Sequence, residues 1–222
     1  MKSNRGYFII GTDTDIGKTY ISSLLYRSCL SKNPSYYKPI QTGCYKKDGS
    51  FIALDPEFLC KFSNIDYNPN MSSYLYKNPL SPHLASEIEN YEIDPNLIKL
   101  KWEEMSSHHP INFVEAAGGI YVPILRNKFY MYDLVKLLNL PVILVSSSKV
   151  GSINHAMLTI SFLKSQNIEI QGIIFNNYTD EFYEKDNIKV ITECSNISNY
   201  LTVAPGQQII SEEDLNKFLG GY

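Results

Sequence analysis

The sequence predicts an α/β domain in which a mostly parallel central sheet is flanked by helices. Strand-like apolar runs alternate with segments of helical spacing along most of the 222 residues, and this alternation is typical of parallel sheets. One glycine-rich loop, Gly11–Thr19, joins the first apolar run to the first helical segment. No repeat, low-complexity tract or linker divides the sequence, so residues 1–222 are expected to form a single domain.

The glycine-rich loop has the features of a phosphate-binding P-loop. It follows the apolar residues Tyr7–Ile10 and precedes the helical segment Tyr20–Tyr26. Backbone N–H groups at such a helix start bind phosphate oxygens, Lys18 would reach the outer phosphates, and the Thr19 hydroxyl would bind Mg²⁺. Five residues separate the two glycines, one more than in the standard pattern. The strand before the loop and the helix after it favour a P-loop NTPase fold.

In the first half of the chain, predicted strands and helices alternate as this fold requires. In order, we expect a helix at 18–32, a strand at 35–38, a helix at 51–62, irregular structure at 63–82, and helices at 83–90 and 94–107. Pro34 ends the first helix, and Asp94 with Pro95 begins the last one. Residues 63–82 have no clear period and are rich in Asn, Ser, Tyr and Pro.

The second half continues the pattern. In order, we expect a strand at 111–116, a helix at 130–138, a strand at 141–145, a helix at 151–166, a strand at 170–176, a helix at 188–194, a strand at 200–203 and a helix from 211. Residues 141–145 are almost continuously apolar, as a central parallel strand should be. Ser211 is a plausible cap for the last helix.

The composition excludes several classes of function. A net charge of −3 gives no electrostatic basis for binding nucleic acid or an anionic membrane. The four cysteines are far apart, which argues against a zinc site or a disulfide scaffold. No apolar run is long enough to span a membrane, and none before the P-loop resembles a signal peptide. We therefore expect a cytoplasmic protein that acts on small molecules.

Candidate site residues follow from the rule that ligands bind beyond the carboxyl ends of parallel strands. Glu115 ends a buried strand, and Thr19, Asp55 and Glu115 could supply oxygen ligands to Mg²⁺. Glu115 could equally be an exposed strand end or part of a salt bridge, and spacing alone makes Asp55 a helix-surface residue. Lys38 could face a terminal phosphate or be solvated. Asn176 could bind a nucleobase edge or cap a turn.

With these residues assembled, the chain resembles dethiobiotin synthetases, the ATP-dependent enzymes of biotin biosynthesis. The family signatures G-T-D-T-x-x-G-K-T, K-P-x-x-[ST]-G, S-P-H-x-A, V-E-G-A-G-G and G-x-I-N-H-A correspond to Gly11–Thr19, Lys38–Gly43, Ser81–Ala85, Val114–Gly119 and Gly151–Ala156. The matches are in register over nearly the whole chain. They include the additional residue between the loop glycines.

The resemblance implies a Mg²⁺-dependent cyclo-ligase that uses ATP, CO₂ and 7,8-diaminopelargonic acid. One amine forms a carbamate, the carbamate is phosphorylated to a carbamic–phosphoric anhydride, and the second amine closes the ureido ring of dethiobiotin. Lys18 and Lys38 would flank the reacting groups, and Thr19, Asp55 and Glu115 would hold Mg²⁺. Thr42 would contact the substrate, and Gly151, Ser152 and Asn154 would bind its carboxylate across a homodimer interface.

The same resemblance assigns nucleotide contacts to residues at several strand ends. These are Thr14, Asp15, Ile16, Gly17, Lys18, Thr19, Tyr20, Asp55, Glu115, Ala116, Ala117, Gly118, Asn176, Asn177, Ala204, Pro205 and Gly206. Three positions depart from the family pattern: Ala116 replaces a glycine, Asp15 replaces a longer Glu, and the segment after Pro205 matches poorly. The last departure predicts weak discrimination among nucleotide bases.

Two other classes of function remain as alternatives. Switch ATPases of the partitioning or cell-division type share this P-loop branch, but they carry a second lysine in the loop, where this chain has Asp13. ATP-dependent amidation enzymes generally add a glutaminase domain, for which this sequence has no length. A nucleotide-binding subunit without catalytic activity is a third, weaker alternative.

Overall fold

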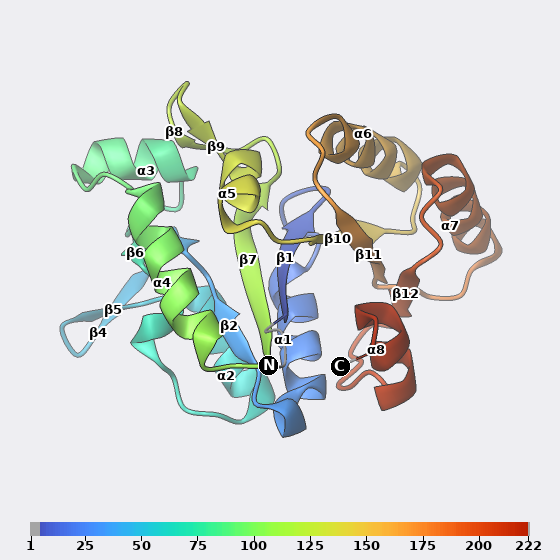
Figure 1. The fold of residues 1–222 in the computed structure, drawn as a ribbon, viewed down its shortest axis with the longest axis horizontal. Helices are drawn as coiled ribbons and strands as arrows, with labels where there is room; N and C mark the ends of the chain where they lie inside the picture. Colours follow the sequence, from blue (N-terminus) through green and yellow to red (C-terminus); the bar gives the residue numbers. More distant parts are fainter. Residues whose placement is uncertain (1–4, 222) are drawn as a thin grey trace.

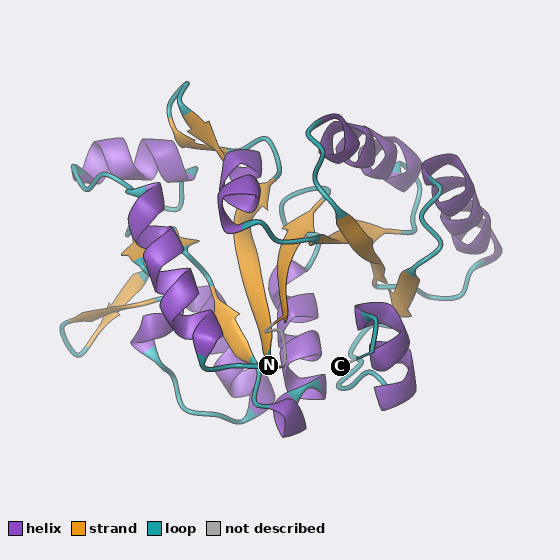
Figure 2. Ribbon diagram, viewed as in Figure 1, coloured by secondary structure: helices purple, strands orange, loops and turns teal. Residues whose placement is uncertain are grey.

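A six-stranded sheet forms the centre of the molecule in the computed structural model, which describes residues 5–221 (Figures 1 and 2). Its strands run in the order β12-β11-β10-β1-β7-β2, and every pair is parallel. Their bounds are β1 Arg5–Gly11, β2 Ser35–Tyr37, β7 Ile111–Gly119, β10 Val142–Ser147, β11 Ile170–Asn176 and β12 Tyr200–Val203. All six strands were expected from the sequence, and the predicted α/β fold with a mostly parallel sheet is confirmed.

One face of the sheet is covered by three helices. These are α1 (Lys18–Ser28), α2 (Leu54–Ser63) and α8 (Glu212–Leu219). Alternate residues of β1 point to opposite faces, so Tyr7 and Ile9 pack with Leu24 of α1 and Phe218 of α8 in one buried cluster. Ser211 caps α8 as predicted, because its hydroxyl accepts a hydrogen bond from the Asp214 N–H at 3.1 Å.

The other face carries five helices. These are α3 (Pro82–Glu89), α4 (Pro95–Ser107), α5 (Met131–Leu138), α6 (Ser152–Ser165) and α7 (Phe182–Ser195). Phe8 and Ile10 of β1 point to this face and pack in a second buried cluster with Leu134 of α5 and Ile160 of α6. The sheet therefore lies between two apolar layers, and only its edges and its strand ends are open to ligands.

The predicted helix at 51–62 is wrong in its first turn. Strands β4 (Tyr45–Lys47) and β5 (Ser50–Ile52) form an antiparallel hairpin, and α2 begins only at Leu54. Asp48 and Gly49 both have positive φ, 51° and 83°, as a two-residue hairpin turn requires. The Asp-Gly pair therefore determines the local structure, and the apolar spacing of Phe51 does not.

Several smaller elements also differ from the expectations. The helix expected at 18–32 ends at Ser28 and is followed by the short turn η1 (Leu30–Lys32), and the helix expected near 188 begins at Phe182. The region expected to be irregular contains η2 (Pro69–Met71) and β6 (Tyr74–Leu75), which pairs with β3 (Ile40–Gln41). The hairpin of β8 (Pro123–Leu125) and β9 (Phe129–Tyr130) was not expected. The pairing of β3 with β6 joins segments that are distant in the sequence, which local patterns do not reveal.

Strand β7 is irregular beside the P-loop. Ile9 pairs with Glu115, but Gly11 pairs with Gly119, so β7 holds extra residues at this point. Gly118 has φ of 87°, and a Cβ there would lie 2.9 Å from Val122. Bulges of this kind bend a strand and redirect its side chains and carbonyls. None of the helices in the described part of the chain is long and apolar enough to cross a membrane.

Candidate active site

A cavity of about 590 Å³ opens at the carboxyl ends of β1, β2 and β7. Most of the predicted phosphate, metal and substrate residues line it. The lining comprises Thr14, Asp15, Gly17, Lys18, Thr19, Lys38, Ile40, Gln41, Thr42, Asp55, Pro79, Leu80, Ser81, Pro82, Glu115, Ala117, Gly118 and Val122. Five separate segments of the sequence therefore meet at the carboxyl ends of the strands, which is the expected place for a ligand.

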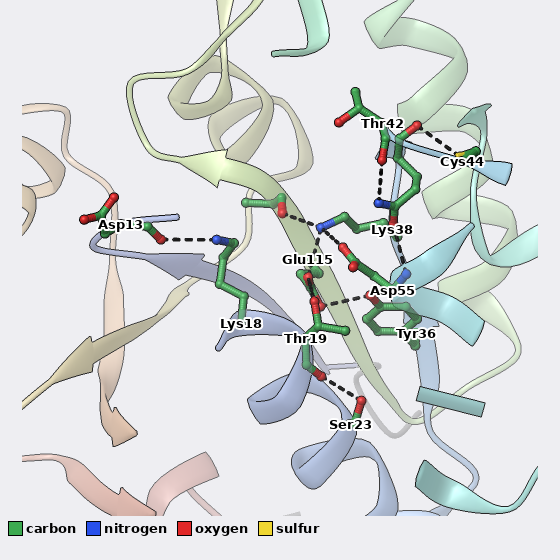
Figure 3. Close-up of polar contacts among 12 residues, drawn as sticks. Asp13, Lys18, Thr19, Ser23, Tyr36, Lys38, Thr42, Cys44, Asp55 and Glu115 are labelled. Carbon is green, nitrogen blue, oxygen red and sulfur yellow. Dashed lines mark hydrogen bonds and ion pairs between the residues drawn. The ribbon is translucent and has the colours of Figure 1, made fainter. Parts of the chain in front are cut away.

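The phosphate loop makes a tight turn between β1 and α1. Gly17 is the residue before the helix and has φ of 94°, a conformation that favours glycine. A Cβ on Gly11 would lie 2.6 Å from Ile16 and 2.8 Å from the Asp13 carbonyl oxygen, so glycine is also required there. Lys18 Nζ donates to the Asp13 carbonyl oxygen at 3.3 Å (Figure 3). The Lys18 side chain is thus hydrogen-bonded to the backbone of its own loop.

Lys38 is a buried lysine and not a solvated one. Its Nζ lies 2.7 Å from Asp55 Oδ2 and 2.9 Å from Glu115 Oε1, and it donates to the Ala116 carbonyl oxygen at 2.7 Å (Figure 3). Only 4% of the residue is exposed. The bulge in β7 turns the Ala116 carbonyl toward this ammonium group. Three oxygen acceptors therefore satisfy the three hydrogens of the buried cation.

Glu115 is completely buried and is held by three different elements. Besides Lys38, the Thr19 hydroxyl donates to Oε1 at 2.8 Å and the Tyr36 hydroxyl donates to Oε2 at 2.9 Å. A buried carboxylate is costly unless it is paired and hydrogen-bonded, and here both oxygens are. The alternative of an exposed strand end is therefore excluded for Glu115.

Asp55 belongs to the same cluster. It lies in the first turn of α2, its backbone N–H donates to the Gln41 side-chain oxygen at 3.2 Å, and its carboxylate pairs with Lys38. The expectation from spacing alone, a helix-surface carboxylate, is wrong. Gln41 therefore links β3 to α2, and its side-chain amide also donates to the Thr42 carbonyl oxygen at 3.0 Å.

The charges of the cluster shift one another's proton affinities. Burial alone would lower the pKa of Lys38, but Glu115 and Asp55 outweigh it and hold that pKa above its ordinary value. Burial would raise the pKa of Asp55, but Lys38 lowers it below the ordinary value. Burial, and then the nearby Lys38 charge, lower the pKa of Lys18. Lys38 and Asp55 are therefore both ionised at neutral pH.

The oxygen donors fit a hard divalent cation. Thr19, Asp55 and Glu115 bring one hydroxyl and two carboxylates to one side of the cavity. Mg²⁺ in phosphoryl-transfer sites commonly takes one or two carboxylates and completes its shell with water and substrate phosphates. Among residues 5–221, no cluster of three or more His, Cys, Asp and Glu side chains is arranged to hold a metal by itself. The donor set therefore suits a metal that is bound together with a nucleotide.

Two residues of the cluster were not expected from the sequence. Tyr36 lies on β2, two residues before Lys38, which directly follows the strand, and side chains two apart in extended chain share a face. That period could have identified Tyr36. Burial, together with Glu115, raises the pKa of Tyr36 well above its ordinary value, so the hydroxyl stays protonated and donates to the carboxylate. Gln41 lay inside a matched motif, but its side-chain contacts follow no sequence pattern.

Predicted nucleotide residues outside this cavity fall into three groups. Tyr20 lines a neighbouring cavity, and its hydroxyl donates to the Gln207 carbonyl oxygen at 2.5 Å. Asn177, Ala204, Pro205 and Gly206 lie in exposed turns after β11 and β12. Ile16, Ala116 and Asn176 contribute backbone or buried polar groups around the loop.

The predicted carboxylate-binding segment lies apart from the cavity of its own chain. Gly151 precedes α6 with φ of 91°, Ser152 is buried, and Asn154 is exposed. None of the three lines the cavity. Val150, immediately before them, is 90% exposed. A single chain therefore does not bring this segment to the phosphate loop.

Comparison with known proteins identifies a group of close relatives. A family model described as an AAA domain matches residues 5–213. The chain is 50% identical to the ATP-dependent dethiobiotin synthetase BioD of Fusobacterium nucleatum, over 96% of this chain and 98% of the relative. It is 38% identical to a protein of the same name from Clostridium perfringens, over 96% of each chain.

Solved structures with a similar fold are more distant. A ParA family ATPase from Chlorobium tepidum aligns with a TM-score of 0.55 at 14% identity, covering 99% of this chain and 90% of that one. The Pyrococcus furiosus cell division ATPase MinD aligns with a TM-score of 0.56 at 11% identity, covering 98% and 97%. At these identities the likeness shows a shared fold alone.

Proposed function

Because this chain belongs to the family of ATP-dependent dethiobiotin synthetases, we propose that it inserts CO₂ between the two amines of 7,8-diaminopelargonic acid. The product is dethiobiotin, and ATP is converted to ADP and phosphate. The chain is thus an ATP-dependent ligase of biotin biosynthesis. The switch-ATPase alternative is supported only by distant structural likeness.

The observation that carries this proposal is the buried Lys38, seated beside the phosphate loop between two carboxylates. One substrate amine combines with CO₂ and loses a proton to give a carbamate. A carbamate oxygen then attacks the γ-phosphorus of ATP, and the bond to ADP breaks. Lys38 and Lys18 lie on the cavity wall, where two cations would offset the charge on the anionic nucleophile and the phosphoryl group.

Thr19, Asp55 and Glu115 would hold Mg²⁺, which supplies charge neutralisation at the phosphates when bound. Asp55 need lose no proton to do so, because Lys38 outweighs burial and lowers its pKa. The phosphate loop N–H groups orient the triphosphate from the other side.

The second half of the reaction needs positioning more than acid–base chemistry. The free amine attacks the carbonyl carbon of the carbamic–phosphoric anhydride, the C–O bond to phosphate breaks, and the ureido ring closes as the attacking nitrogen loses a proton to the released phosphate or to water. Thr42 and residues Pro79–Pro82 form another part of the cavity wall. Such a wall would hold the two amines on one side of the substrate and exclude water from the reactive anhydride.

We also propose that the working unit is a homodimer in which Gly151, Ser152 and Asn154 of one chain bind the substrate carboxylate of the other. Their separation from the cavity within one chain supports this arrangement. An apolar surface lies next to them: Val150, Leu158 and Tyr121 are 90%, 64% and 61% exposed, and Tyr121 contacts Phe162 of α6. The backbone N–H groups at the start of α6 suit a carboxylate.

The direct test is product formation. The protein would be mixed with 7,8-diaminopelargonic acid, bicarbonate, ATP and Mg²⁺, and dethiobiotin and phosphate would be measured by mass spectrometry and a colorimetric assay. Omitting the diamine is the control for ATPase activity alone. The absence of dethiobiotin with folded protein would overturn the proposal.

The dimer is tested by complementation between two inactive variants. Lys38→Met keeps the carboxylate segment intact, and Asn154→Ala keeps Lys38 intact. In a one-to-one mixture, sites shared across a two-fold interface would restore about a quarter of wild-type activity. A mixture that stays inactive would show that each chain uses its own segment.

A further inference from the structure

One buried carboxylate outside the cavity has no role in the proposed reaction. Glu184 lies in the first turn of α7, and 0% of the residue is exposed. Its Oε2 accepts hydrogen bonds from the Thr179 N–H at 2.9 Å, the Thr179 hydroxyl at 2.8 Å and the Glu181 N–H at 3.2 Å. These bonds fix the turn that joins β11 to α7. Helix capping accounts for this oxygen but not for the other.

The second oxygen of Glu184 bonds a different loop. Oε1 accepts from the Ser148 hydroxyl at 2.7 Å, and Ser148 is also 0% exposed. Three residues further along α7, the Asn187 side-chain Nδ2 donates to the Ser148 carbonyl oxygen at 2.8 Å. Ser148 directly follows β10. Two side chains of α7 therefore hold the first residue of the chain between β10 and α6, one by its hydroxyl and the other by its carbonyl.

Glu184 carries its negative charge inside the protein. Burial would raise its pKa, but the hydrogen bonds from Ser148, Thr179 and Glu181 outweigh burial and lower that pKa below its ordinary value. An ionised carboxylate only accepts hydrogen bonds, so all of these donors can point at it together. The bond from the Ser148 hydroxyl is therefore charge-assisted, which makes it stronger than a bond between neutral groups.

The chain that Ser148 starts leads directly to the residues proposed to bind the substrate carboxylate. Residues 149–151 are exposed, and the Ser152 N–H closes a turn over them by donating to the Lys149 carbonyl oxygen at 3.0 Å. The contacts of Ser148 with α7 lie at the start of this turn. The direction in which the chain leaves β10, and with it the N–H groups at the start of α6, therefore depends on Ser148.

We propose that Glu184 is a positioning residue for substrate binding: through Ser148 it holds the turn before α6 so that the N–H groups at the start of α6 point at the substrate carboxylate. This inference rests on the proposed homodimer, in which that carboxylate lies in the cavity of the other chain. A turn that is fixed before the substrate arrives loses less freedom on binding, so the substrate is bound more tightly.

The Ser148 hydroxyl can be removed without removing the cap of α7. In Ser148→Ala, Glu184 keeps its bonds from Thr179 and Glu181 and loses only the link to the turn before α6. KM for 7,8-diaminopelargonic acid should rise by about tenfold with little change in kcat, and KM for ATP should stay within about twofold of wild type. Ser148→Thr keeps the hydroxyl and should restore KM. An unchanged KM for the diamine, or an equal rise in KM for ATP, would overturn the proposal.

A double-mutant cycle assigns the effect to the pair. Glu184→Ala should raise KM for the diamine by about as much as Ser148→Ala, and the double variant should add little to either. Additive effects would show that Ser148 acts without Glu184 and would overturn the proposal. If Glu184→Ala does not fold, Asn187→Ala takes its place in a test of the same turn: it removes the bond to the Ser148 carbonyl and should raise KM for the diamine, and no rise would count against the proposal.

Thr179→Val is the matched control. It also removes a hydroxyl that donates to Glu184, but the Thr179 N–H still bonds Oε2 and the Ser148 bond is intact. KM for the diamine should stay within about twofold of wild type. A tenfold rise in this variant would assign the effect of Ser148→Ala to a general loosening of α7 and overturn the proposal.

The dimer allows the turn to be tested in the chain that uses it. In a mixture of Lys38→Met and Asn154→Ala, the working site takes its cavity from the Asn154→Ala chain and its carboxylate segment from the Lys38→Met chain. Ser148→Ala added to the Lys38→Met chain should raise KM for the diamine by about tenfold, and the same change in the Asn154→Ala chain should leave it unchanged. Equal values in the two mixtures would overturn the inference.

The parent mixture separates this inference from the proposed dimer. If Lys38→Met and Asn154→Ala together stay inactive, the proposed dimer is rejected and the inference is rejected with it. If the parent mixture is active and the position of Ser148→Ala makes no difference, the inference alone is rejected.

Discussion

Replacing Lys38 by Met removes the cation from the centre of the site while keeping most of its volume. The ammonium group contacts two carboxylates and one carbonyl at 2.7–2.9 Å and is almost fully buried. Lys18 keeps its hydrogen bond to the Asp13 carbonyl oxygen, and the loop N–H groups make no contact with Lys38 that the substitution would remove. The variant should therefore separate catalysis from nucleotide binding.

The expected magnitudes follow from the burial. Losing one preorganised charge at the reacting phosphoryl group should lower kcat by about 10³, or about 4 kcal/mol. Two carboxylates left without their buried partner should cost about 3 kcal/mol of stability, which for a domain of this size lowers the melting temperature by about 6–12 °C. Part of that loss should return when Mg²⁺ is added, since a divalent cation would neutralise Asp55 and Glu115.

The assay has three readouts: kcat for dethiobiotin formation, ATP affinity by calorimetry, and the melting temperature with and without Mg²⁺. Lys61→Met is the control, because that lysine pairs with Glu57 on the surface of α2 and its side chain is 72% exposed. It should match wild type in all three. If Lys38→Met keeps more than about a tenth of kcat, or loses ATP binding while folded, the assigned role of Lys38 is refuted.

Three further predictions follow from the geometry. Gly17→Ala should abolish measurable ATP binding by calorimetry, because the added methyl would lie 2.1 Å from Asn176 Nδ2 at a φ of 94°; binding within about tenfold of wild type would contradict this. Because the Asp55 pKa is lowered by Lys38, its stabilisation is present above the ordinary carboxyl range near pH 4 and is lost as pH falls through the lower value. Melting curves between about pH 5 and pH 2 should therefore be less steeply pH-dependent for Asp55→Asn than for wild type, and identical slopes would count against the ion pair. Comparable kcat/KM with ATP and GTP is expected from the exposed, poorly matching turn after β12, and a preference of about a hundredfold or more would refute weak base discrimination.

The sequence was a sufficient guide to the sheet but only a partial guide to the site. The apolar runs locate all six strands along the sequence. Residues at or near the carboxyl ends of these strands, among them Thr19, Lys38 and Glu115, lie together as expected. Local spacing failed at Asp55, because its neighbour in space is Lys38 and not another residue of α2. The sequence alone leaves a strand-end lysine open to solvation, and only the folded sheet shows it buried.

Contacts between distant segments were beyond local patterns. The bond from Asn176 to Ile16 joins residues 160 positions apart, and the bond from Tyr20 to Gln207 spans 187. Each depends on strand order, which periodicity does not determine. The Asp48-Gly49 turn is a different case. The sequence contained the signal for a hairpin, but the predicted helix at 51–62 followed the apolar spacing instead.

The position of Lys38 between Asp55 and Glu115 affects the order in which ligands bind. Because its ammonium group contacts both carboxylates, Lys38 acts as their counterion within the protein. A free divalent ion would have to displace that ammonium group unaided, whereas a metal that arrives on a nucleotide brings phosphate oxygens for both Lys38 and Lys18. The carboxylates then pair with the metal and the lysines pair with the phosphates, so no charged group is left without a partner. Metal and nucleotide should accordingly enter together, and titration of the protein with Mg²⁺ alone should give only weak binding.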